Sequence, residues 1–363
     1  MDERAPTGLA TARPTGVDQV LLASPRGFCA GVEMAIKALA WMVRVFEPPV
    51  YCYHQIVHNE WVVKAFERVG VRFVDDIGDV PIGAPIMLSA HGSSPEVVAA
   101  AADRAAVVID AVCPLVTKVH HEVKRMANNG FDIIYVGHRG HDEALGTLAE
   151  APEQMTLVEP DDGLDRFHAA DPAKVALLAQ TTLGTYEWQE VLDRASARFP
   201  DLVTSRKSDL CYATTNRQEA VQALAKECEL ILVVGSENSS NTQALVRVAR
   251  EHGVDAHRID RASDIEEAWL LEVSVVGLTA GASAPDHLVT EVIDRLNPAK
   301  GFELLAVTDE EEYFPLPPQL RSFVTTLQHL VEAGFTAVEA GAGPLERDRE
   351  WTATEALSLI AGR

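Results

Sequence analysis

Three cysteines of this chain occupy the same kind of position, directly after a strand-like stretch and before a helix-like one. Cys29 lies in SPRGFCAGVE, Cys113 follows AVVIDA, and Cys211 opens CYATTNRQEA. A thiol at such a helix start can be a nucleophile or a metal ligand, since the helix dipole lowers its pKa. A glycine-bounded turn there can also cradle a phosphate. The recurrence favours a metal ligand, because nucleophilic catalysis needs one cysteine and a partner base.

Two polar loops follow each cysteine in the same order, each after an apolar run. They are His58-Asn59 and HGSSP (91–95), GHRGHDEALGT (137–147) and QTT (180–182), and GSENSSN (235–241) and GASAP (281–285). The first loop lies nearly the same number of residues beyond its cysteine in all three blocks. This periodicity predicts three related structural units.

Short β-rich runs alternate with helix-like segments along the chain, which is typical of parallel sheets covered by helices. The predicted fold is α/β, with three related parallel-sheet units arranged pseudo-threefold around a common centre. We expect a flexible N-terminus at 1–17, units at 18–112, 113–205 and 206–297, a segment at 298–321 that returns to the body, and a partly helical tail at 322–363. In such sheets, ligands bind beyond the carboxyl ends of the strands, where these loops lie.

Composition limits the classes of partner. The net charge of -23 argues against binding to nucleic acid or to an anionic membrane, which would require clustered Lys and Arg. The chain has no long apolar run typical of a membrane span or a signal peptide, so we expect a cytoplasmic protein. Five cysteines in a reducing compartment are read as thiols or metal ligands before disulfides.

Three converging thiols fit either a three-cysteine zinc site or an iron-sulfur cluster with one iron not held by the protein. The simpler alternative is that cysteines after strands are small core residues. We apply that alternative to Cys52, inside an apolar run, and to Cys228, near a helix end.

The loops supply hydrogen-bond donors with little fixed charge, a set that can hold a phosphate or diphosphate. The candidates are His58, His91, His141, Thr181, Ser239, Ser240, Asn241 and Ser283. Any one Ser or Thr could be only a helix cap, so it is the set that favours an anion site. A proton donor is sought among Glu60, Asp142, Glu143 and Glu237, and Glu143 is preferred because its loop carries two histidines and several glycines.

In combination, these segments closely resemble 4-hydroxy-3-methylbut-2-enyl diphosphate reductase, the IspH or LytB family. The matching segments run from about residue 18 to about residue 321 and include RGFCAGVEMAI, SAHGSSP, DAVCPLVTKVH, QTTLGT, GSENSSNTQAL and TAGASAPD. The resemblance implies a three-lobed assembly around a 4Fe-4S cluster. It also implies the last step of the methylerythritol phosphate route to isoprenoids, in which the allylic diphosphate is reduced and dehydrated to isopentenyl and dimethylallyl diphosphates.

The resemblance also implies roles for individual residues. Cys29, Cys113 and Cys211 would hold three irons, and the fourth iron would accept the substrate hydroxyl. The diphosphate would be surrounded by His58, His91, His141, Ser239, Ser240, Asn241 and Ser283. Thr181 would lie close to the hydroxyl, with Glu143 as proton donor, and a one-electron donor such as ferredoxin or flavodoxin would be needed.

One departure from the family pattern is local. Where the family usually reads His-Pro-Glu, this chain has His141-Asp142-Glu143, which removes a fixed φ and adds a carboxylate beside the expected anion site. Two other readings stay open: a noncatalytic iron-sulfur sensor that binds a diphosphate metabolite, and a structural zinc site.

Overall fold

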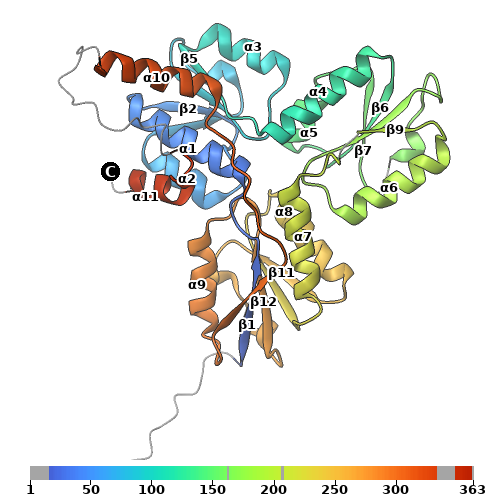
Figure 1. The fold of residues 1–363 in the computed structure, drawn as a ribbon, viewed down its shortest axis with the longest axis vertical. Coiled ribbons are helices and arrows are strands. Elements are labelled where there is room, and N and C mark those ends of the chain that lie inside the picture. Colours follow the sequence, from blue (N-terminus) through green and yellow to red (C-terminus); the bar gives the residue numbers. More distant parts are fainter. Residues whose placement is uncertain (1–15, 162, 206–207, 333–347, 362–363) are drawn as a thin grey trace, which may run out of the picture.

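The computed structural model describes residues 16–161, 163–205, 208–332 and 348–361. The strands form three sheets, and the sheets with their helices make three lobes around a common centre (Figure 1). Neighbouring strands are parallel in all three sheets. The most apolar strands, such as β10 (Leu230–Val234), are buried along their whole length because helices cover the sheet. The predicted fold class of three parallel-sheet α/β units is therefore confirmed.

The first lobe contains a four-stranded sheet of order β3-β2-β4-β5. Its strands are β2 (Val50–Tyr53), β3 (Val71–Val74), β4 (Pro85–Leu88) and β5 (Val107–Asp110). The helices of this stretch are α1 (Ala30–Val45), α2 (Glu60–Arg68) and α3 (Pro95–Arg104). Helix α3 begins with Ser94 as N-cap and Pro95 at its first position, a combination that favours a helix start.

The second lobe repeats this pattern with the order β7-β6-β8-β9. Its strands are β6 (Asp132–Val136), β7 (Met155–Val158), β8 (Val175–Ala179) and β9 (Val203–Thr204). Its helices are α4 (Pro114–Asn128), α5 (Asp142–Leu148) and α6 (Thr185–Arg198).

The third lobe has a five-stranded sheet of order β11-β10-β12-β1-β13. Its strands are β1 (Gln19–Ser24), β10 (Leu230–Val234), β11 (Asp255–Ile259), β12 (Val275–Ala280) and β13 (Phe302–Ala306). Its helices are α7 (Tyr212–Leu224), α8 (Ser240–Glu251) and α9 (Asp286–Leu296).

The first strand of the chain corrects the predicted unit 18–112. Strand β1 pairs with β12 and β13 of the third lobe and not with the strands that follow it in sequence. In Figure 1 it lies in blue among the orange strands of the lower lobe. Val20 and Leu22 of β1 are buried in the third-lobe core. Because β1 pairs with β13, the beginning and the end of the family-like segment lie side by side in this sheet.

Each of the three cysteines is the N-cap of a helix at a junction between lobes. Cys29 caps α1, Cys113 caps α4 and Cys211 caps α7. The strand before each cysteine belongs to one sheet, and the chain enters the next lobe after it. This connectivity brings the three helix starts to the centre of the molecule.

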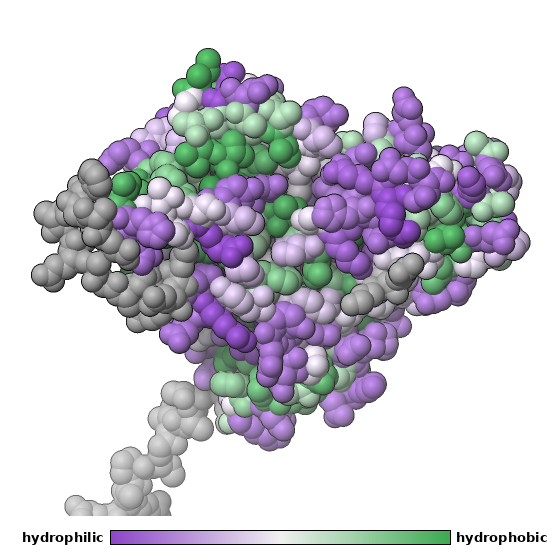
Figure 2. Space-filling model, turned by 45° about the horizontal axis from the view of Figure 1, so that its top comes forward, coloured by the Kyte–Doolittle hydropathy of each residue, from purple (hydrophilic) through white to green (hydrophobic). Residues whose placement is uncertain are grey.

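Hydrophilic residues dominate the face shown in Figure 2, and hydrophobic residues gather there in smaller groups. None of the described helices is both long and apolar enough to span a membrane.

The C-terminal part of the chain contains two helices: α10 (Pro318–Glu332), which begins at the end of the family-like segment 298–321, and α11 (Ala353–Ala361) beyond it. In α10, Phe323 stacks on Phe46 with ring centroids 5.3 Å apart, whereas Leu327 and Leu330 are exposed. Phe335, which continues the apolar spacing of Phe323, Leu327 and Leu330 in the sequence, lies outside the described residues. The apolar face of α11 packs on α1 and α2 and extends the first-lobe core.

A buried ion pair joins the segment before α11 to the helix that Cys29 caps. Lys37 of α1 lies 3.3 Å from the Asp348 carboxylate and donates to the Asp348 carbonyl at 2.7 Å. Tyr313 donates its hydroxyl proton to the other carboxylate oxygen of Asp348. Lys37 is only 2% exposed, so this ion pair with Asp348 is buried.

We expect Asp348→Ala to lower the free energy of unfolding by about 3 kcal/mol, because removing one partner leaves a buried charge uncompensated. Chemical denaturation of the full chain measures this loss. Glu350→Ala is the matched control, since Glu350 is an exposed acid two residues away, and its effect should stay within about 0.5 kcal/mol. Equal stability of the two variants would contradict the buried-pair interpretation.

Candidate active site

A central cavity is lined by all of the site residues predicted from the sequence. It lies where the three lobes meet, at the carboxyl ends of their strands. The predicted residues that line it are Cys29, Cys113, Cys211, His58, His91, His141, Glu143, Thr181, Ser239, Ser240, Asn241 and Ser283. Their roles remain predictions, but their convergence is a property of the fold.

The thiols lie close together at the cavity wall. A methyl group placed on Gly31 would lie 2.8 Å from the Cys113 sulfur and 3.9 Å from the Cys29 sulfur, so both sulfurs flank the same point. The position of Gly31 therefore has no room for a side chain. Gly27, in contrast, has a φ of 65° and serves the turn before Cys29.

Two of the three thiols, Cys113 and Cys211, favour their neutral form in the protein alone. Burial, followed by the neighbouring charge of Cys29, raises the pKa of Cys211 to about 11 and raises that of Cys113 further. A metal centre would reverse this preference, because its positive charge stabilises thiolates. Thr214 supports Cys211 from the next turn, with its N–H 3.2 Å and its hydroxyl 3.0 Å from the sulfur. The thiols, their mutual repulsion and the Gly31 cradle together fit an iron-sulfur cluster.

Gly31→Ala is expected to lower the iron and sulfide content of anaerobically purified protein by at least half, because the new methyl would meet the Cys113 sulfur. Gly16→Ala is the control, since nothing lies within 4 Å of a methyl group at that position. Full iron content in the Gly31 variant would show that the cradle does not limit the site.

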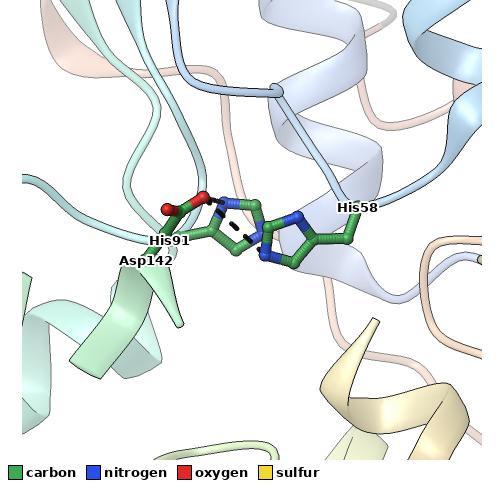
Figure 3. A group of neighbouring side chains, drawn as sticks. All are labelled: His58, His91 and Asp142. Atoms are coloured by element: carbon green, nitrogen blue, oxygen red, sulfur yellow. Dashed lines mark ion pairs between the residues drawn. The ribbon is translucent and has the colours of Figure 1, made fainter. Parts of the chain in front are cut away.

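A pair of stacked imidazoles forms another wall. His58 and His91 stack with ring centroids 3.9 Å apart and planes 17° from parallel (Figure 3). The ring of His141 approaches that of His58 edge-on. His58 Nε2 and His91 Nδ1 are buried and have no hydrogen-bond partner. His141 Nδ1 accepts from the Glu143 N–H at 3.2 Å, which leaves its Nε2 free to donate. These nitrogens are available to a ligand in the cavity.

Ligand atoms of His58, His91 and Asp142 lie within 4.8 Å of one another, a spacing that deserves a test as a metal site. The two nearly parallel rings argue against it, because their in-plane lone pairs run side by side and do not converge on one cation. An anion is the better ligand, since donors from stacked rings can reach different oxygens.

The histidines are neutral in the protein alone. Burial lowers the pKa of His58 and His91, and burial followed by the charge of His58 lowers that of His141 to about 3. A bound anion acts in the opposite direction and favours their protonated forms. We expect anion binding to be coupled to proton uptake.

Helix starts and polar loops of the third lobe supply further donors. Ser239 caps α8, and the Asn241 oxygen accepts from the Ala282 N–H at 2.9 Å. This bond points the Asn241 amide nitrogen away, where it is buried without a partner. Ser283 donates to the His58 carbonyl at 2.8 Å and so links the third lobe to the first.

Glu143 is fully buried beside Thr181. The Thr181 N–H donates to one carboxylate oxygen at 2.6 Å, and the Thr181 hydroxyl donates to the other at 2.9 Å. Burial outweighs these two bonds and raises the pKa of Glu143 to about 7. This carboxyl can therefore hold a proton near neutrality, unlike Glu60, which pairs with Lys64 at the surface.

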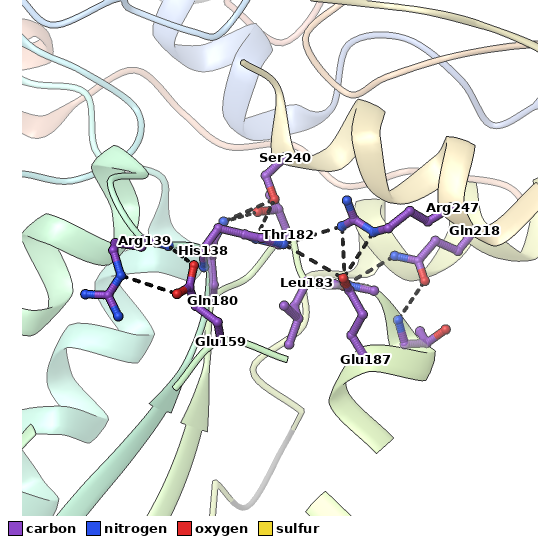
Figure 4. Close-up of polar contacts among 12 residues, drawn as sticks. His138, Arg139, Glu159, Gln180, Thr182, Leu183, Glu187, Gln218, Ser240 and Arg247 are labelled. Carbon is purple, nitrogen blue, oxygen red and sulfur yellow. Dashed lines mark hydrogen bonds and ion pairs between the residues drawn. The ribbon is translucent and has the colours of Figure 1, made fainter. Parts of the chain in front are cut away.

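A polar network missed by the sequence analysis joins the second and third lobes (Figure 4). Gln180 accepts from the His138 N–H at 2.9 Å and donates to Thr182 at 2.8 Å and to Ser240 at 3.2 Å. Ser240 also lies 3.4 Å from His138 Nδ1, so its hydroxyl contacts two side chains of the second lobe. The position of Gln180, directly after a buried strand, could have marked it as a residue of the site.

A fully buried arginine, Arg217 of α7, also escaped the sequence analysis. It donates to the Gly27 carbonyl at 2.8 Å and pairs with Glu310 at 2.8 Å. It ties the turn before Cys29 to the helix that begins after Cys211. Nothing in its sequence context separates it from a surface arginine.

The matching family model and the similar known proteins all point to the same family. The family model described as LytB protein matches residues 20–297. The chain is 48% identical over 308 residues to 4-hydroxy-3-methylbut-2-enyl diphosphate reductase of Mycolicibacterium paratuberculosis, covering 84% of this chain and 92% of that one. It is 47% identical over 307 residues to the protein of the same name from Streptomyces avermitilis, covering 84% of this chain and 90% of that one.

The solved structure of the E-1-hydroxy-2-methyl-but-2-enyl-4-diphosphate reductase from Plasmodium falciparum matches with a TM-score of 0.83 at 33% identity. The match covers 86% of this chain and 99% of that one. A second solved structure, a (E)-4-hydroxy-3-methyl-but-2-enyl diphosphate reductase described as the terminal enzyme of the non-mevalonate pathway, matches with a TM-score of 0.55 at 28% identity, over 77% of this chain and 99% of that one. The central cavity, the three-lobed fold and these matches together place the chain in the LytB family of 4-hydroxy-3-methylbut-2-enyl diphosphate reductases.

Proposed function

We propose that this protein is the reductase its relatives are named for. It converts (E)-4-hydroxy-3-methylbut-2-enyl diphosphate to isopentenyl and dimethylallyl diphosphates, the last step of the methylerythritol phosphate route. The observation that carries the proposal is the composition of one cavity: three thiols, a set of unpartnered anion donors and a buried protonatable carboxyl line the same space.

The proposed cofactor is a 4Fe-4S cluster held by Cys29, Cys113 and Cys211. When bound, such a cluster supplies electrons one at a time and acts as a Lewis acid. The overall reaction takes up two electrons and two protons, breaks the allylic C–O bond, forms one C–H bond and releases water. The electrons come from an external one-electron donor such as ferredoxin or flavodoxin.

The protein's own residues bind the substrate and move the proton. Glu143 is the proton donor, since its raised pKa keeps it partly protonated near neutrality. Thr181, which donates to both carboxylate oxygens of Glu143, would lie close to the substrate hydroxyl. A proton delivered to that hydroxyl turns the leaving group into water.

The diphosphate would lie among His58, His91, His141, Ser239, Ser240, Asn241 and Ser283. One observation supports this part of the proposal: the buried nitrogens His58 Nε2, His91 Nδ1 and Asn241 Nδ2 lack hydrogen-bond partners among the described residues. Binding a dianionic group would satisfy these donors and protonate the histidines.

A cytoplasmic location is part of the proposal. All five cysteines of the chain are described, and none forms a disulfide, as expected in a reducing compartment.

Anaerobic metal and sulfide analysis, followed by an activity assay on the same sample, tests the proposal. We expect brown protein with iron and sulfide that converts the substrate steadily when given a reductant. Colourless protein that contains zinc would support a structural zinc site. Brown protein that binds diphosphate without turnover would support the noncatalytic sensor, which the named relatives already disfavour.

A further inference from the structure

An acidic side chain faces the proposed diphosphate site. Asp142 is the first residue of α5, between His141 and Glu143. One of its carboxylate oxygens lies 3.8 Å from both His58 Nε2 and His91 Nδ1, the two unpartnered nitrogens of the stacked pair (Figure 3). A free carboxylate there would compete with a diphosphate for these donors and repel it.

The other oxygen of Asp142 has a closer partner from a different lobe. His54, directly after β2, donates from Nδ1 to this oxygen at 2.8 Å. The distance is that of a charge-assisted hydrogen bond, whereas 3.8 Å to His58 and His91 is too long for one. The carboxylate is therefore bonded to His54 and only near the stacked pair.

His54 is fixed in place for this contact. The backbone N–H of His54 donates to the carbonyl of Val74, the last residue of β3, at 2.9 Å. The imidazole ring of His54 stacks on the ring of Tyr53 with centroids 4.1 Å apart. Its φ of 55° is left-handed, which is rare for a residue other than glycine. Three separate constraints thus hold the imidazole where it meets Asp142.

The two groups also favour each other's charged forms. The hydrogen bond from His54 to Asp142 is the largest cause that raises the pKa of His54, and the charge of Asp75 adds to it. Burial alone would raise the pKa of Asp142, but the hydrogen bond and charge of His54, together with His58 and His141, lower it. Each charged form stabilises the other, so His54 offsets the negative charge that Asp142 brings to the anion site.

We propose that His54 is the counter-charge of Asp142: it holds this carboxylate away from the His58–His91 pair and keeps the cavity able to bind a diphosphate group. His54 is a positioning residue here and does not itself contact the ligand. The inference rests on the proposed function for the identity of the ligand, but the contact between the two residues does not depend on turnover.

Inorganic diphosphate is the probe, titrated calorimetrically into anaerobically purified, cluster-loaded full-length protein. His54→Gln is expected to weaken its binding at least about tenfold, because the released carboxylate is an unbalanced charge a few ångströms from the anion. Asp142→Asn should bind diphosphate no more weakly than wild type. The decisive variant is the double substitution His54→Gln with Asp142→Asn, which should return to within about twofold of wild type.

His257→Gln is the matched control, since His257 forms a similar pair with Asp255 at 3.3 Å on β11 and does not line the cavity. It should bind diphosphate as wild type does. In steady-state assays, His54→Gln should raise KM about tenfold with kcat changed less than about threefold, because the lost interaction acts on binding.

A double variant as weak as His54→Gln would overturn the inference, since His54 would then act without Asp142. Unchanged binding in His54→Gln would overturn it as well. Wild-type protein that fails to bind diphosphate would overturn both this inference and the proposed anion site. If the variants bind diphosphate with the expected relative affinities but the wild type shows no turnover, the proposed activity is refuted and the role of His54 is supported.

Discussion

Cys113→Ser is expected to abolish turnover and to leave anaerobically purified protein with little iron or sulfide. Burial and the charge of Cys29 already raise the pKa of this thiol, so the thiolate forms only where a positive centre stabilises it. A serine hydroxyl is a much harder and more basic ligand, and iron-sulfur clusters are held by thiolates. Three thiols line this wall of the cavity, so the substitution removes one of the three proposed cluster ligands.

Iron and sulfide analysis with the visible absorption spectrum measures the effect. Cys228→Ala is the matched control: this thiol packs in the third-lobe core, away from the cavity, so the variant should keep its cluster and lose about 1 kcal/mol of stability. If Cys113→Ser protein retained full iron and activity, the three-cysteine assignment would be wrong. Loss of iron in the Cys228 variant would point to a general folding defect instead.

The recurrence of a strand, a cysteine and a helix in that order was the main basis for predicting the three units and their central site. Parallel α/β lobes place loops at the carboxyl ends of their strands, so residues far apart in sequence could be expected to meet. Cys52 and Cys228, which break the pattern, lie in the hydrophobic core as expected. The pattern worked because it depends on chain direction and strand position, which the apolar runs make visible.

Sheet membership was harder to predict. Strand β1 precedes Cys29 in sequence yet pairs with β12 and β13, more than 250 residues away. An apolar strand signals burial but does not identify its neighbours. Strands β3 and β9 give a weaker signal than the central strands, because they are only partly buried and β9 is two residues long.

The pairing of charges was not predictable from the sequence. Asp142 looked like an added negative charge beside an anion site, but the structure balances it with His54 from another lobe. The network through Gln180, Ser240 and His138 likewise crosses lobes. Such pairs depend on side-chain directions after the lobes have packed, which the order of residues does not encode locally.

Glu143→Gln is expected to lower kcat by about 10²–10⁴-fold while the variant keeps its cluster and its affinity for substrate. Glutamine has the shape of the protonated side chain, and its amide oxygen can still accept from the Thr181 N–H, so the cavity should stay intact. What it loses is the transferable proton. Rapid mixing with substrate and reductant, together with iron analysis of the same sample, separates binding from chemistry.

The pH profile gives this assignment a second test. Glu143 must be protonated to act as an acid, and its pKa is raised to about 7, so kcat of wild type should fall as the pH rises through about 7. The folded protein also holds this proton where an unfolded chain would lose it, so between pH 4.5 and about 7 the group makes the wild type less stable as the pH rises. Glu143→Gln should show neither trend, whereas Glu60→Gln, at an exposed acid paired with Lys64, should keep both. If Glu143→Gln turned over at the wild-type rate, the proton would have to come from another donor. If kcat of the wild type did not change across pH 7, Glu143 would not titrate in the rate-limiting step.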